Sequence, residues 1–180
     1  QNGDSRISQI AVAQTYFAVQ TRRQEIFDKL PEEEKRLFVR EEVSNENKKL
    51  FRTAKEAGVS HFGLFNDAGY KGLYGIPLRE IEAKKGIKKG ELLDRAGASE
   101  LAANLFRITQ TDDKIRIDSI RGDAAAQRTH NMIGGKVRQT IKDIGGILPE
   151  NRKPERHIKE LQKEKKLLAK QAKKIGGYSN

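Results

Sequence analysis

Apolar residues recur at steps of three and four along most of this 180-residue chain, the spacing that places them on one face of an α-helix. The pattern predicts a mainly α protein: a multi-helix bundle with one short loop or hairpin rich in glycine and aromatic residues, and an extended C-terminal helix. We expect helices over residues 5–30, 31–58, 77–86, 99–111, 123–145 and 154–175. The loop or hairpin is expected over residues 59–75.

Prolines and glycines mark where several of these helices start and stop. Pro31 and Pro77 fit the first helical position, where the missing amide hydrogen is not needed. Gly58 and Gly86 follow the helices that these prolines open, and glycine is favoured just after a helix end. The helix over residues 31–58 is either continuous or interrupted at residues 44–45.

The central helix begins after its expected N-cap, Ser99, and has an asymmetric face. At about 100° per residue, its predicted apolar arc consists of Leu101, Ala102, Leu105, Phe106, Ile108 and Thr109. Asn104, Arg107 and Thr111 form a hydrogen-bonding row along one edge of that arc. Such a row either fixes a neighbouring element or meets a ligand, so we take these residues as a candidate partner-binding motif.

Residues 59–75 show no helical period, which predicts tight turns or a short hairpin. Within them, Tyr70, Lys71 and Tyr74 combine two rings and a cation, a set that can stack on bases and pair with phosphate. The other interpretation, which we favour, is that the tyrosines pack into a hydrophobic cluster beneath the loop. The three residues stay candidate nucleic-acid contacts.

The helix over residues 123–145, with Asp123 as its expected N-cap, carries one stripe: His130, Ile133, Val137, Ile141 and Ile144. We expect His130 to be a hydrogen-bonded core histidine rather than a catalytic base. Gly134 and Gly135 each cost about 1 kcal/mol relative to alanine. We therefore expect another backbone to approach them closely, on the side of the central helix that carries Ala102 and Ala103.

The helix over residues 5–30 is apolar around nearly its whole circumference, which requires burial on two sides. We favour a central place in one bundle. The alternative is that one side meets either a missing N-terminal domain or a second copy of the chain, as in a dimer.

The sequence offers little for catalysis or metal binding. It has no cysteine, which excludes disulfides and thiolate chemistry. His61, His130 and His157 lack metal-site spacing, and Asp112 and Asp113 have no third acid or histidine at ligand spacing. We expect no catalytic residue, no metal, no cofactor and a non-enzymatic function.

Charge points to a polyanionic partner. Lysine and arginine number 36 against 25 acids, a net charge of +11, and cations near a phosphate backbone release its counterions. The candidate phosphate contacts gather around residues 77–97: Arg79, Lys84, Lys85, Lys88, Lys89 and Arg95. The solvent side of the helix over residues 123–145 offers further candidate partner contacts: Arg128, Lys136 and Arg138.

Prolines near residue 149 predict a helical core domain, residues 1–148, followed by a linker and a basic C-terminal helix, residues 149–180. Residues 151–175 carry ten lysines and arginines against three glutamates. This helix either packs along a partner or the bundle with a basic face toward DNA, or is a solvated terminal helix. No apolar run is long enough to span a membrane, so a cytoplasmic location is expected.

Five segments resemble the DNA damage-inducible protein D (DinD) family, in order and over nearly the whole chain: AVAQTYFAVQTRRQE, NKKLFRTAKEAGV, GYKGLYG, LLDRAGASELAANLFRITQTDDK and HNMIGGKVRQTIKDIGGILPE. The resemblance implies a further N-terminal domain that resembles phage BRO or antirepressor modules, and we expect this sequence to represent the part without it. The resemblance implies damage-induced (SOS) expression and association with the RecA recombinase and its filament on single-stranded DNA.

Two functions are therefore open. The first is a non-enzymatic accessory protein of the DNA-damage response that binds DNA, the RecA filament or both, and modulates the filament. The alternative is an oligomerisation and effector module of a phage-type BRO/antirepressor-like transcription regulator. An apolar first helix and a heptad-like last helix favour the alternative.

Overall fold

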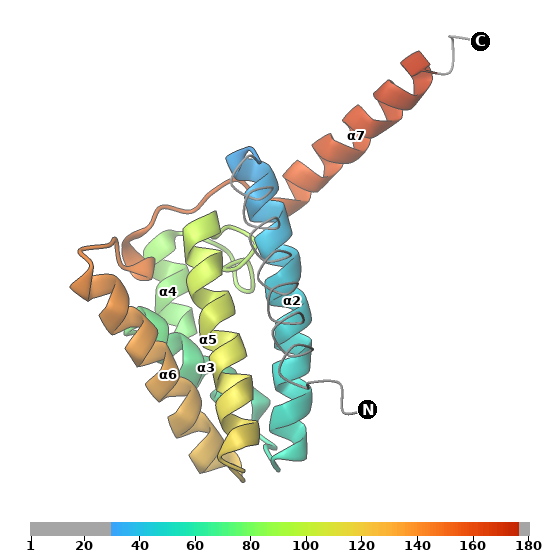
Figure 1. Ribbon diagram of the computed structural model, residues 1–180. Helices are drawn as coiled ribbons and strands as arrows, with labels where there is room; N and C mark the ends of the chain where they lie inside the picture. The colour runs from blue at the N-terminus through green and yellow to red at the C-terminus, as the bar shows by residue number, and fades with distance from the viewer. Residues whose placement is uncertain (1–29, 177–180) are drawn as a thin grey trace, which may run out of the picture. The chain divides into compact units, whose positions relative to one another are not determined.

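The computed structural model describes residues 30–176 and the side chains of residues 30–171 (Figure 1). The chain divides into two compact units, Gln1–Lys35 and Arg36–Asn180, and the second holds every element below except the first turn of α2. The helices are α2 (Glu32–Glu56), α3 (Phe62–Tyr74), α4 (Leu78–Lys85), α5 (Ala98–Ile117), α6 (Asp123–Asp143), the 3-10 turn η1 (Pro149–Asn151) and α7 (Ile158–Gly176). The mainly α bundle is confirmed. The helix expected over residues 5–30 lies outside the described residues.

The second helix runs without the interruption considered at residues 44–45. Val39, Val43, Leu50 and Ala54 are buried, and their spacing keeps one face inward past that point. The helix stops at Gly58 as predicted, where φ is +82° and the Val59 amide donates to the Ala54 carbonyl at 2.9 Å.

The predicted loop or hairpin over residues 59–75 is wrong, because most of it forms α3. Two of its glycines, Gly69 and Gly72, serve helix packing, whereas Gly75 is the left-handed C-cap of α3. A Cβ added at Gly72 would collide with the Asn131 carbonyl of α6, and one added at Gly134 would lie 2.8 Å from the Gly69 oxygen. Figure 1 shows α3 beside α6. The glycines that looked like turn formers therefore let two helix backbones approach each other.

The close approach expected at Gly134 is thus confirmed, but the partner is α3 and not the Ala102 side of α5. A Cβ at Gly135 would meet nothing within 4 Å, so the expectation is wrong there. The stripe on α6 is also shorter than predicted: His130 and Val137 are buried, whereas Ile144 is 77% exposed.

The face of α5 differs most from prediction. Within the predicted apolar arc only Leu101 and Ile108 are buried, and Phe106 is 56% exposed. The buried face instead includes a polar row: Glu100, Asn104, Arg107, Thr111 and Asp112. The hydropathy pattern predicted that the apolar residues face inward. Hydrogen bonds with α3 and α6 instead stabilise polar side chains at the centre of the buried face.

The two expected N-caps do not cap their own helices. Gly97 occupies the N-cap position of α5 in an extended conformation, and Ser99 lies one residue into the helix. The carboxylate of Asp123 accepts the amide hydrogens of Ser60 and His61 at 3.0 Å and 2.9 Å, so it holds the start of α3 instead of α6.

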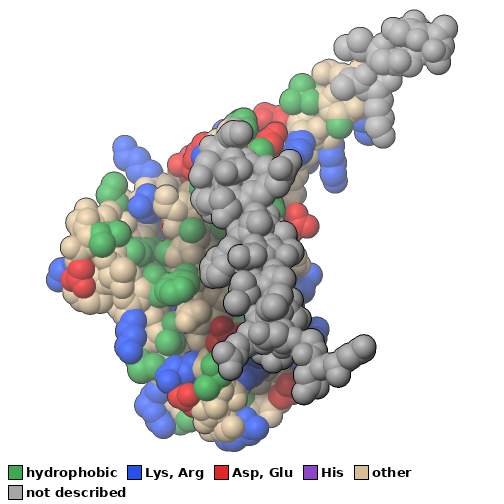
Figure 2. Space-filling view, in the orientation of Figure 1, with side chains coloured by type: hydrophobic (Ala, Val, Ile, Leu, Met, Phe, Trp, Pro, Cys, Tyr) green, Lys and Arg blue, Asp and Glu red, His purple; other side chains and the backbone are tan. Residues whose placement is uncertain are grey.

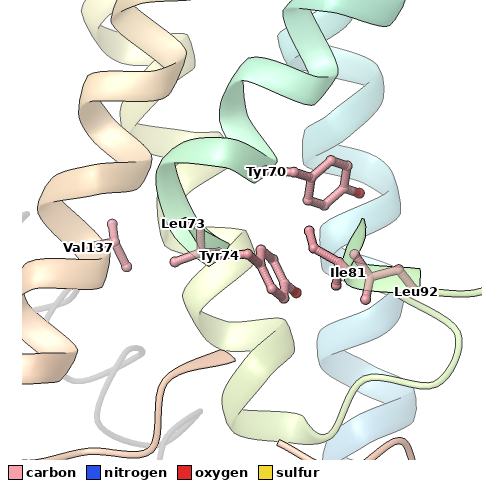
Figure 3. Packing of buried hydrophobic residues seen from close by; sticks show 6 residues of the cluster. All are labelled: Tyr70, Leu73, Tyr74, Ile81, Leu92 and Val137. Carbon is pink, nitrogen blue, oxygen red and sulfur yellow. The ribbon is translucent and has the colours of Figure 1, made fainter. Parts of the chain in front are cut away.

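The hydrophobic core joins α3, α4 and α6 with the segment after α4. Its buried members are Tyr70, Leu73, Tyr74, Ile81, Leu92 and Val137 (Figure 3). This cluster fixes α4 and the residues that follow it, where the predicted phosphate contacts lie.

Candidate nucleic-acid interface

The segment between α4 and α5, residues 86–97, is irregular but firmly held; we call it the α4–α5 loop. The buried Glu82 carboxylate accepts the Gly90 amide hydrogen at 2.6 Å. Arg36 donates to the Ala96 and Asp94 carbonyls, each at 2.7 Å. Any cation on this loop is therefore presented from a fixed backbone.

Three predicted phosphate contacts remain available in this region. Arg79, Lys88 and Lys89 are exposed, and within residues 30–176 none of them has an ion pair or side-chain hydrogen bond. Lys84 is also exposed, but its Nζ donates to the Asn151 Oδ1 at 2.9 Å. A cation that forms no internal ion pair can meet a phosphate group without first breaking one.

Two others are engaged within the protein: Lys85 is buried, which rules it out as a phosphate contact, and Arg95 stays a prediction. The side chain of Lys85 is only 3% exposed, and its Nζ donates to the Glu100 carboxylate at 3.2 Å and to the Arg152 carbonyl at 2.7 Å. Arg95 is half-buried and donates to the Glu91 carboxylate at 2.7 Å, which lowers the pKa of Glu91. Lys85 thus ties the end of α4 to α5 and to Arg152, whereas the ion pair of Arg95 lies within the loop.

Tyr70 and Tyr74 cannot stack on bases because both rings are buried, as Figure 3 shows beside Ile81 and Leu92. The favoured interpretation, packing in a hydrophobic cluster, is confirmed. Lys71, between them, is exposed and pairs with the Asp67 carboxylate at 3.0 Å. The three residues do not form one surface.

The row Asn104, Arg107 and Thr111 fixes neighbouring elements and presents nothing to solvent, since all three side chains are buried. Asn104 donates to the Tyr74 hydroxyl at 2.9 Å, and Tyr74 donates to the Glu100 carboxylate at 2.8 Å. Burial raises the pKa of Glu100, against the opposing effect of Lys85. The row is therefore wrong as a partner-binding motif.

Arg107 continues this network to His130, as a buried cation without a carboxylate partner in the described part of the chain. It donates to the Asn104 Oδ1 at 3.1 Å and to the His130 Nε2, and it lies over the Tyr70 ring. His130 donates from Nδ1 to the Phe65 carbonyl at 3.0 Å. Burial and the neighbouring Arg107 hold the pKa of His130 well below its usual value, so His130 is the core histidine that the sequence predicted.

Of the three basic candidates on α6, two are exposed and one is engaged by an acid. Arg128 and Lys136 are exposed. Arg138 is half-buried and makes two hydrogen bonds, of 2.6 Å and 2.7 Å, to the Glu150 carboxylate. Although burial raises the pKa of Glu150, these bonds bring it below its usual value. Arg138 thus ties η1 to α6, and its role as a partner contact stays a prediction.

The C-terminal segment returns to the α4–α5 loop. The Glu155 and Ile158 amides donate to the Arg95 and Asp94 carbonyls at 2.8 Å and 2.9 Å. Ile158 and Leu161 are buried, whereas every side chain of residues 162–171 is exposed. Figure 2 shows cationic side chains on this helix. The sequence-based candidate set omitted the α7 lysines, although the charge of residues 151–175 was the signal for them. The proposed division at residue 148 stays a prediction.

The described residues offer neither a metal site nor a membrane-spanning helix. Within residues 30–176, no three histidine or acidic side chains are grouped so that they could hold a metal ion. None of the described helices combines the length and the apolar character that a membrane crossing needs.

Comparison with known proteins confirms the resemblance seen in the sequence. The family model of the DinD C-terminal domain matches residues 30–161. The DNA damage-inducible protein D of Escherichia coli (strain K12) is 46% identical over 181 residues, which cover 94% of this chain and 66% of that relative. The chain therefore spans about two thirds of the length of the relative.

Proposed function

Because the chain belongs to the family of DinD C-terminal domains, we propose that it serves the DNA-damage response as a non-enzymatic accessory protein. It binds DNA, or the filament that the RecA recombinase forms on single-stranded DNA, and modulates that filament. The relative is named for induction by DNA damage, which supports a role in that response.

The observation that carries the proposal is the pair Lys88 and Lys89 on the α4–α5 loop. Both are exposed and neither forms an ion pair in the described part of the chain, although Lys88 acts on the Glu91 carboxylate at longer range; Arg36 and Glu82 hold their backbone in place. A fixed pair of unmatched cations suits a phosphate backbone, since binding releases condensed counterions without first breaking an internal ion pair.

Binding of a labelled single-stranded oligonucleotide to the full chain, measured by fluorescence anisotropy over a salt series, tests the proposal. We expect the Lys88→Gln/Lys89→Gln variant to bind more weakly and to lower the slope of log K against log salt by about 1.4. A matched control, Lys48→Gln/Lys55→Gln, removes two exposed cations from α2 and should leave the slope nearly unchanged.

A second experiment separates naked DNA from the filament. The chain is mixed with single-stranded DNA immobilised on beads, bare or coated with RecA, and the retained protein is measured. Retention on either substrate supports the proposal, and the ratio tells which one is preferred. Absence of retention on both, at low salt, contradicts it.

The alternative of an oligomerisation module has one observation in its favour. Leu168 lies seven residues after the buried Leu161 on the same face of α7, yet is 65% exposed. A Leu168→Glu variant that converts a stable dimer to a monomer, measured by light scattering, would favour this alternative.

A further inference from the structure

The lysines of α7 occupy one face of the helix. Lys159, Lys163, Lys166 and Lys170 follow one another at steps of four, three and four, and at about 100° per residue they fall within about 60° of one another. All four side chains are exposed. At about 1.5 Å per residue the row is about 16 Å long. We call these four residues the α7 lysine row.

No acid of the described part of the chain balances this row: none of its lysines has an ion pair there. The two acids of the helix, Glu160 and Glu164, lie outside the arc and are engaged by Arg156, whose Nε is 3.7 Å from the Glu160 carboxylate. Like charges one turn apart repel each other and destabilise an isolated helix. A bound anion would therefore stabilise the row.

The base of α7 is anchored beside the α4–α5 loop. Ile158 is buried, its amide donates to the Asp94 carbonyl at 2.9 Å, and His157 Nε2 lies 3.7 Å from the Asp94 carboxylate. The first lysine of the row follows directly after Ile158. The row therefore starts from the loop that carries Lys88 and Lys89.

We propose that the α7 lysine row binds the phosphate backbone of a nucleic-acid strand. The row is linear and about 16 Å long, the axial length of about five nucleotides of one strand. This inference rests on the proposed function, namely that the chain binds nucleic acid, and adds a surface that the loop alone does not supply.

Charge and hydropathy favour this occupant over two others. A second copy of the chain carries the same net charge of +11 and would be repelled. An anionic membrane also attracts lysine, but Leu167, Leu168 and Ala169 are consecutive and point about 100° apart. Among the exposed residues 162–171, Leu168 is the one large apolar side chain on the face of α7 that carries the buried Leu161, so little apolar area is available there to insert into lipid.

The test is binding of the full chain to a labelled single-stranded oligonucleotide over a salt series, with the variant Lys159→Gln/Lys163→Gln/Lys166→Gln/Lys170→Gln. Glutamine preserves helix propensity, which circular dichroism checks. We expect at least a tenfold loss of affinity and a slope lowered by about 2.8, which is the loss of four phosphate contacts. A duplex oligonucleotide in parallel reports whether the strand must be single.

The matched control is Lys48→Gln/Arg52→Gln/Lys55→Gln/Lys142→Gln, which removes the same charge from exposed positions on α2 and α6. Equal weakening by both variants would overturn the inference, because total charge would then explain the binding. Loss of binding in Lys88→Gln/Lys89→Gln with full binding in the α7 variant would also overturn it, while the proposed function would stand. A wild-type chain that binds phosphatidylserine vesicles but no oligonucleotide would overturn both.

Discussion

Arg107 donates a hydrogen bond from its guanidinium to Nε2 of His130, and neither side chain has a carboxylate partner within the described residues. Both are buried between α3, α5 and α6. The pair tolerates burial because His130 is neutral: its Nδ1 proton is bound by the Phe65 carbonyl, which leaves Nε2 free to accept. One ring thus links the backbone of α3 to the buried cation of α5.

We predict that this pair makes stability sensitive to mild acid. The pKa of His130 in the folded state lies well below the ordinary 6.5, because of burial and Arg107. The unfolded chain therefore takes up a proton that the folded chain excludes. The contribution of His130 to the free energy of unfolding should be at its maximum above about pH 6.5. Below that pH, the free energy of unfolding should fall by up to about 1.4 kcal/mol per pH unit.

Urea denaturation between pH 7.5 and 5 measures this dependence, and His130→Gln is the control. The variant is expected to be less stable at neutral pH but to show a shallower decline, since all other titrating groups are common to both proteins. Parallel pH profiles would mean that His130 is not the group responsible.

We predict opposite effects for alanine at the two adjacent glycines of α6. The Cβ of Gly134→Ala would lie 2.8 Å from the Gly69 oxygen and the Leu73 nitrogen, both backbone atoms that cannot rotate away. We expect a loss of about 1–3 kcal/mol. At Gly135 a Cβ meets nothing within 4 Å, so Gly135→Ala should stabilise by up to about 1 kcal/mol. Thermal or urea unfolding gives both values, and a destabilised Gly135→Ala would contradict this packing.

These glycines also explain where sequence reasoning stopped. The apolar pattern and the boundary residues were enough to predict α4 and the end of α2. Pro77, Gly86 and Gly58 act through local backbone geometry, which the sequence alone reveals. Gly69 and Gly72 carry the same local signal as turn residues. Their role in helix packing becomes visible only once the position of α6 is known. The amino-acid sequence alone does not give that position.

Sequence could not tell the exposed from the buried candidate cations for a related reason. Lys85 and Lys88 have the same charge and similar neighbours in sequence, yet one is buried against Glu100 and the other is exposed. Charge pattern predicts a basic region but not which cations are already matched, because the matching acids come from distant elements. Asn104 and Arg107 were likewise predicted at the edge of an apolar face. In the structure they are buried at its centre.

We predict a large cost for removing the buried cation Lys85. Lys85→Met would leave Glu100 buried without its partner, which typically costs about 3–5 kcal/mol. Burial already raises the pKa of Glu100 above 4.5, and loss of Lys85 should raise it further. The deficit should therefore be largest at high pH and shrink as pH falls through the raised folded-state pKa values, because Glu100 then becomes protonated in the folded form of both proteins.

Lys84→Met is the matched control for this measurement, since Lys84 is exposed and, among the described residues, its side chain bonds to Asn151 and forms no ion pair. It should change the free energy of unfolding by less than about 0.5 kcal/mol. Equal effects of the two substitutions in urea unfolding would show that the Lys85–Glu100 pair is not what holds α4 to α5.

Asp123 should control the start of α3 rather than that of its own helix. Its carboxylate accepts the Ser60 hydroxyl and the Ser60 and His61 amides, bonds that lower the pKa of Asp123. A lowered pKa means that this hold is present above about pH 4 and weakens as pH falls. We expect Asp123→Ala to speed amide hydrogen exchange over residues 60–65 at neutral pH. Asp118→Ala, which removes an exposed ion pair with Lys114, should not. Faster exchange confined to the first turn of α6 would instead restore Asp123 to the N-cap role that the sequence suggested, because the α3 contacts would then contribute nothing measurable.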